Sequence, residues 1–108
     1  KEQAAAQEQN PQPVKVNLYK LRKEREADLR KRRTALSRLE EAIEENEGRI
    51  QALEEKLQDP EVAADYEAVT TASQEIAGLH EKGESLLLEW TQLSEELEEL
   101  EQAASQER

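Results

Sequence analysis

A hydrophobic heptad repeat runs through most of this chain and is interrupted once, at Asp59-Pro60-Glu61. A period of 3.5 residues keeps one stripe of a helix facing a partner, which is typical of a coiled coil. The interruption favours a new helix start, because Asp caps a helix, Pro fits its first turn and Glu suits its positive end. The sequence therefore predicts two long helices that fold back on each other as an antiparallel hairpin. The stripe consists of Leu29, Leu36, Leu39, Ile43, Ile50, Leu53 and Leu57, then Val69, Ile76, Leu79, Leu86, Trp90, Leu93, Leu97 and Leu100.

The composition supports an all-α hairpin rather than a globular domain. Charged residues make up 38% of the chain and aromatic residues 3%, with no Phe, Met or Cys. This is enough apolar surface for a seam between helices but too little for the core of a 108-residue globule. The lack of Cys excludes a disulfide framework and a thiolate metal site. No apolar run reaches the roughly 18 residues of a membrane span, and no signal peptide is visible, so we expect a cytoplasmic protein without a membrane partner.

The ends of the chain differ from its middle. Residues 1–13 contain two prolines and no aromatic residue, so they cannot bury enough surface to become ordered. We predict a flexible linker or tail over residues 1–17, helices over about 18–58 and about 60–104, and a frayed end over 105–108. Because the chain starts at Lys1 without Met, we interpret it as a piece of a larger protein.

A tight turn also predicts the register of the hairpin, meaning which residues lie opposite each other. In an antiparallel pair the a positions of one helix face the d positions of the other, which places Asn46 opposite Ile76 and Leu39 opposite Gly83. A polar residue such as Asn46 in a seam fixes register at some cost in stability. Gly83 leaves room for the Leu39 side chain, so a Leu at position 83 is expected to overpack the seam by roughly 1–3 kcal/mol.

The same register places Arg32 against Trp90. A guanidinium over an indole face contributes roughly 0.5–2 kcal/mol, so we expect these two side chains to stack in the seam. The alternative function for Trp90 is to stack on a nucleic-acid base or to dock a partner. Leu87 and Leu88 fall outside the a and d positions, and they either widen the seam or form a small exposed patch.

The net charge of −11 is spread unevenly. Between Lys15 and Arg38 there are ten basic and three acidic residues, which give a local charge of +7. The remainder of the chain carries −18. One interpretation is that glutamates of the second helix neutralise these cations across the hairpin. The other is a phosphate-binding surface. Both can hold, because the four consecutive basic residues 30–33 point all round a helix.

The chain offers little for catalysis. His80 is the only histidine, and no Cys, Ser or carboxylate arrangement with triad logic accompanies it. The glutamates recur at helical spacing, which indicates solvent-exposed carboxylates on the polar helix faces rather than acid–base pairs or metal ligands. No glycine-rich phosphate loop is present. We therefore expect no catalytic residue, no metal site and no cofactor in this chain.

Several local motifs between Leu21 and Leu100 go beyond the heptad pattern. They are the basic stretch from Glu24-Arg25 to Arg30-Lys31-Arg32-Arg33, Leu39-Glu40-Glu41-Ala42-Ile43, Ile50-Gln51-Ala52-Leu53-Glu54, the turn Leu57-Gln58-Asp59-Pro60-Glu61-Val62, and Glu89-Trp90-Thr91-Gln92-Leu93. With these motifs the chain resembles the C-terminal coiled-coil domain of ABC-F ATPases, which are ATP-binding-cassette proteins without membrane spans.

The resemblance implies more than the residues themselves do. Full members of the family carry two cassettes that bind ATP and Mg²⁺ and act on ribosomes, and their C-terminal arm contacts DNA or ribosomal RNA without being catalytic. The heptad register and the helix-start signal, by contrast, assign structural roles to Asn46, Asp59, Pro60, Gly83 and Trp90. The alternative function is a structural or protein–protein coiled coil that binds no nucleic acid. The positions implied to contact nucleic acid are Arg25, Arg30, Lys31, Arg32 and Arg33.

The short break predicts a monomer. A short connection holds the two halves of the stripe close together, so pairing within one chain is favoured over pairing between chains. Sedimentation at micromolar concentration should therefore give the mass of a single chain. A stable dimer with an opened turn and helices exchanged between chains would contradict the hairpin.

Overall fold

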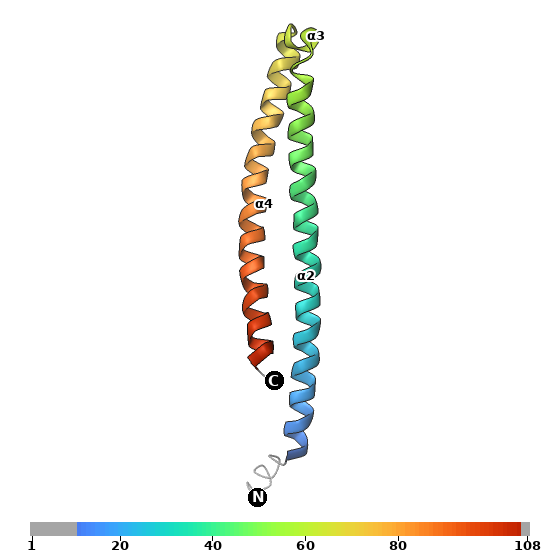
Figure 1. Cartoon of the computed structure of the whole chain (residues 1–108), viewed down its shortest axis with the longest axis vertical. Coiled ribbons are helices and arrows are strands. Elements are labelled where there is room, and N and C mark those ends of the chain that lie inside the picture. The colour runs from blue at the N-terminus through green and yellow to red at the C-terminus, as the bar shows by residue number, and fades with distance from the viewer. Residues whose placement is uncertain (1–10, 107–108) are drawn as a thin grey trace, which may run out of the picture.

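The computed structural model describes residues 11–106, and the side chains from residue 17 onward. Two long helices, α2 (Pro11–Lys56) and α4 (Tyr66–Gln106), lie side by side and run in opposite directions, joined at one end by the short helix α3 (Pro60–Ala63) (Figure 1). No strand occurs among these residues. The predicted helical hairpin is therefore confirmed. None of the described helices contains a stretch apolar enough to span a bilayer.

Helix α2 begins earlier than the sequence predicted. It starts at Pro11 rather than near residue 18, so residues 11–17 of the expected tail are helical, and residues 1–10 lie outside the described part. Pro11 and Pro13 are compatible with this start, because the first N–H groups of a helix have no acceptor within it. The first residues of α2 extend beyond the end of α4 (Figure 1). The frayed end was predicted over 105–108, but α4 includes Ser105 and Gln106, and residues 107–108 are not described.

The tip contains two helix starts where the sequence predicted one. Asp59 caps α3, and its Oδ1 accepts a hydrogen bond from the Glu61 N–H at 3.0 Å. Helix α3 ends after a single turn, and Asp65 then caps α4 by accepting from the Ala68 N–H at 3.2 Å. The second long helix therefore begins at Tyr66 rather than at residue 60. The Asp65-Tyr66-Glu67 segment carries the sequence signal for this start, an N-cap Asp followed by an acidic first turn.

The longer tip changes the register by about one heptad. Asn46 lies against Leu79 and Gly83 rather than Ile76, since its Nδ2 donates to the Leu79 carbonyl at 2.9 Å. Trp90 lies against Glu40, to whose Oε2 its indole N–H donates at 3.0 Å. The predicted pairs Arg32–Trp90 and Leu39–Gly83 are therefore wrong. The residues that the sequence analysis placed at the start of the second long helix form α3 instead. Each residue of α4 therefore lies opposite a different residue of α2 from the one predicted.

The apolar stripe forms a thin seam. All fifteen of its residues are buried or half-buried. Among the residues whose side chains are described, only four hydrophobic ones are buried, and Asn46 joins them at 6% exposure. Leu87 and Leu88 do not widen the seam, because they are 52% and 60% exposed. The buried hydrophobic residues are Leu29, Leu53, Ala72 and Leu97.

The Asn46 layer gives a test of this register. A Cβ added at Gly83 would lie 2.9 Å from Asn46 Nδ2, whereas one added at Gly78 in the same helix meets nothing within 4 Å. Gly78→Ala should raise the free energy of unfolding by about 0.5–1 kcal/mol, the usual gain of Ala over Gly in a helix. Gly83→Ala should fall short of that gain by about 1 kcal/mol, because Asn46 must shift from its acceptor.

Chemical denaturation measures the free energy of unfolding of both variants, first in the wild-type chain and then in an Asn46→Ala background. The comparison separates the contact with Asn46 from the difference in helix propensity between Ala and Gly. Removing the Asn46 amide should make Gly83→Ala as stabilising as Gly78→Ala. Equal gains in the presence of Asn46 would show that Gly83 does not face it.

Candidate nucleic-acid interface

The basic segment of α2 lies along the half of the hairpin away from the tip, where α4 carries many glutamates. Residues 89–102 of α4 contain six Glu and no basic residue. Opposite them lie the basic residues of α2. The side chains of successive residues in this helix project in directions about 100° apart. Their environments therefore differ according to the face on which each one lies.

Arg32 and Arg33 face α4 and are ion-paired. Arg32 occupies a d position and joins two carboxylates, Asp28 on its own helix and Glu96 on α4, with 3.4 Å between its Nε and Glu96 Oε1. Arg33 directs two nitrogens at Glu101 Oε2, with Nη2 at 2.9 Å and Nε at 3.3 Å. The expected neutralisation across the hairpin therefore occurs at these two residues. An arginine is tolerated in the seam position because it holds two acids together.

Arg30 and Lys31 face the other way. Both side chains are exposed, and neither forms an ion pair within the part of the chain that the structure describes. Arg25 is half-buried and is engaged by another group. Of the five residues implied by the family resemblance, Arg30 and Lys31 are thus the ones whose charges are directed to solvent.

The structure also shows pairings that the sequence analysis did not identify. Arg49 binds Glu75 of α4 through two nitrogens, at 2.9 and 3.3 Å, and the hydrogen bond and charge of Glu75 raise the pKa of Arg49. Arg33 and Glu101 occupy e positions, and Arg49 and Glu75 occupy g positions. The e positions of the two helices therefore face each other on one side of the seam, and the g positions on the other. A correct register would have revealed both pairs.

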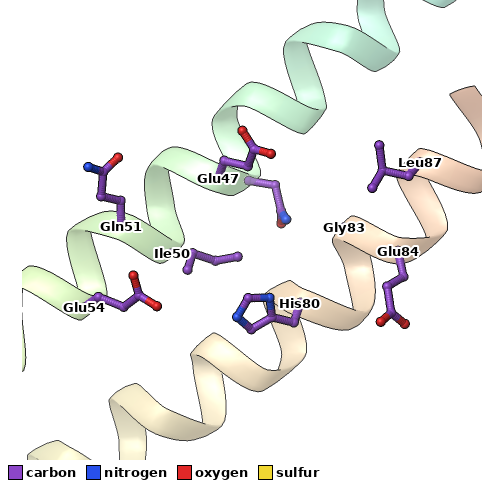
Figure 2. Close-up of a pocket in the computed structure, with 9 residues that line it drawn as sticks. Glu47, Ile50, Gln51, Glu54, His80, Gly83, Glu84 and Leu87 are labelled. Atoms are coloured by element: carbon purple, nitrogen blue, oxygen red, sulfur yellow. The ribbon is translucent and has the colours of Figure 1, made fainter.

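The e side also carries an open hollow at mid-arm, of about 530 Å³. Figure 2 shows Ile50 and the His80 ring lying between the two helices, with Gly83 and Leu87 along α4. Among the described residues, no three His, Cys, Asp or Glu side chains gather closely enough to hold a metal ion. His80 is an exposed residue at the rim of this hollow.

The Arg33–Glu101 pair should contribute little, because the two side chains are 53% and 45% exposed. A double-mutant cycle with Arg33→Ala and Glu101→Ala should give a coupling of about 0.2–1 kcal/mol that falls as salt rises. The same cycle with Arg30→Ala in place of Arg33→Ala should give a coupling near zero. Equal couplings would show that Glu101 does not distinguish the two arginines.

Comparison with models of protein families identifies a family to which the chain is similar. The model of the ABC transporter C-terminal domain family matches residues 29–95, which include the part of each long helix nearer the tip, the tip itself and the basic residues 30–33. No curated protein and no solved structure matches the chain. The family match covers well over half of the 108 residues. The chain belongs to the ABC transporter C-terminal domain family.

Proposed function

We propose that this chain is the non-catalytic C-terminal arm of an ABC-F type ATPase and that it contacts nucleic acid, either DNA or ribosomal RNA, through the outer face of α2. In this proposal the ATPase cassettes of the parent protein bind ATP and Mg²⁺ and supply the energy. The arm supplies reach, since α2 alone is 46 residues and therefore about 69 Å long. The parent works in the cytoplasm on ribosomes.

The observation that carries the proposal is that two of the four consecutive basic residues 30–33 are ion-paired and two are not. Arg32 and Arg33 are engaged with carboxylates and hold α2 against α4. Arg30 and Lys31 are exposed and have no carboxylate partner in the described residues. Unpaired cations on a helix surface can neutralise phosphates and release their counterions, which gives binding without sequence preference.

The acidic remainder of the chain limits the affinity. A net charge of −11 opposes approach to a polyanion, so we expect a dissociation constant of roughly 10⁻⁴–10⁻⁶ M, typical of non-specific binding. Within the parent protein the arm would add this weak contact to others made by the cassettes.

A second candidate function is a protein-docking coiled coil. The exposed and adjacent Leu87 and Leu88 favour it, because contiguous exposed apolar surface can mark a protein–protein contact. Salt distinguishes the two functions. Phosphate binding collapses between low and moderate salt, whereas apolar docking does not.

The test is a titration of duplex DNA and structured RNA with the chain at two salt concentrations. Arg30→Glu combined with Lys31→Glu should abolish the binding seen at low salt. The matched control is Lys56→Glu with Lys82→Glu, which makes the same change in net charge at two exposed lysines elsewhere on the hairpin. The control should retain most of the binding, and the wild-type affinity should fall steeply as salt rises.

Two results would contradict this function. One is the absence of binding at low salt. The other is an equal loss in the two double variants, which would show that only net charge matters. The arm would then be interpreted as a spacer or a protein-docking element.

A further inference from the structure

We infer that the e side of the hairpin is a docking groove for a basic amphipathic helix from a protein partner. This surface is separate from Arg30 and Lys31, so its test is independent of nucleic-acid binding. Two neighbouring hollows of about 530 and 370 Å³ share Leu87 and together form an elongated groove along the arm. The apolar residues that line it are Ile43, Ile50, Leu87 and Trp90.

The rim of the groove is acidic. Five glutamates line the two hollows, and no Lys or Arg does. On the g side of the seam, by contrast, Glu96 and Glu75 are paired with arginines. The five are Glu40, Glu44, Glu47, Glu54 and Glu84.

The heptad explains why three of these five glutamates have no basic residue opposite them. Glu40, Glu47 and Glu54 occupy successive e positions of α2. The pairing of Arg33 with Glu101 shows which e positions of α4 face them, and these are Ser94, Leu87 and His80. No Lys or Arg stands opposite the three carboxylates, which therefore form a row with a spacing of about 10.5 Å. A helix with Lys or Arg once per heptad repeats at the same distance.

A buried acceptor in the groove points to a ligand independently of the acidic rim. Asn46 lines the larger hollow and is only 6% exposed. Its orientation is set by the bond from Nδ2 to the Leu79 carbonyl, and Oδ1 then has no donor among the described residues. An unsatisfied buried oxygen is unfavourable. Because Asn46 lines the larger hollow, a Lys or Arg side chain of the partner that enters this hollow would supply the missing donor.

The exposed apolar wall favours a helix as the occupant. Leu87 is 52% exposed and lies where the two hollows meet. A third helix packed along the groove would cover this side chain with its own apolar stripe, as helix-in-groove complexes do. Its basic flanks would then meet the row of glutamates.

The probe is a 21-residue peptide of three heptads with Leu at a and d, Lys at e and g, and no aromatic residue. Lysines at both flanking positions prevent the peptide from pairing with itself. Trp90 is the single tryptophan of the chain and lines the groove, so its emission reports binding locally. The Lys peptide should give a saturable blue shift, and a peptide with Glu in place of Lys should give none.

Two matched pairs of variants locate the site. Glu47→Lys with Glu54→Lys should weaken binding by about tenfold or more, and Glu41→Lys with Glu55→Lys, at exposed f positions, by less than about twofold. Leu87→Ser should weaken binding, and Leu88→Ser, which removes a leucine that is slightly more exposed, should not. Circular dichroism checks that each variant stays helical.

Several outcomes would overturn the inference. They are no saturable shift with the Lys peptide, an equal shift with the Glu peptide, or equal effects within either matched pair. Sedimentation of the chain alone at the same concentrations should give a monomer. Self-association that buries Trp90 would show that a second copy, rather than a basic helix of another protein, covers the groove.

Discussion

The structure depends on a single apolar seam between two helices. The long helices pack against each other, so each buries one stripe, and only four hydrophobic side chains in the described part of the arm are buried. Most of the stabilisation of a long helix in water comes from packing such a stripe, because helix propensity alone is marginal. Every other feature of the arm, including the position of its charges, is set by how the two stripes meet.

That dependence explains which parts of the structure the sequence could predict. The period of the stripe identified the helices and all fifteen seam residues, and the break at Asp59-Pro60-Glu61 indicated their antiparallel packing. The register could not be read from the same pattern, because sliding one helix by seven residues again places a opposite d. The choice between such registers lies in the tip, where Asp59 caps one extra turn of helix, α3, and a second capping residue, Asp65, then begins α4. The same distinction holds for the candidate site, where some features depend on the register and others do not. Arg30 and Lys31 face outward whatever the register, whereas the partners of Arg32 and Trp90 depend on it.

The seam also divides the charges into two unlike sides. On the g side, Arg32 lies between Asp28 and Glu96, and Arg49 holds Glu75. On the e side, Arg33 holds Glu101, and the glutamates nearer the tip have no basic residue opposite. Exposed ion pairs contribute little to stability, so this asymmetry does not hold the fold together. Its consequence is a hairpin whose surfaces differ in sign, with exposed cations on the outer face of α2 and exposed acids along one groove.

The Asn46 layer shows how a polar residue can select one register among several that satisfy the stripe. In the observed register its Nδ2 reaches the Leu79 carbonyl, and Gly83 leaves space for the amide. A slide by one heptad would place Asn46 against the Ile76 side chain, where no Gly makes room for it. A buried amide without a partner costs about 1–3 kcal/mol, which is a large fraction of what a thin seam provides. In the same layer, Asn46 Oδ1 has no donor among the described residues. Asn46 therefore selects the register and also presents an unsatisfied hydrogen-bond acceptor beside the groove.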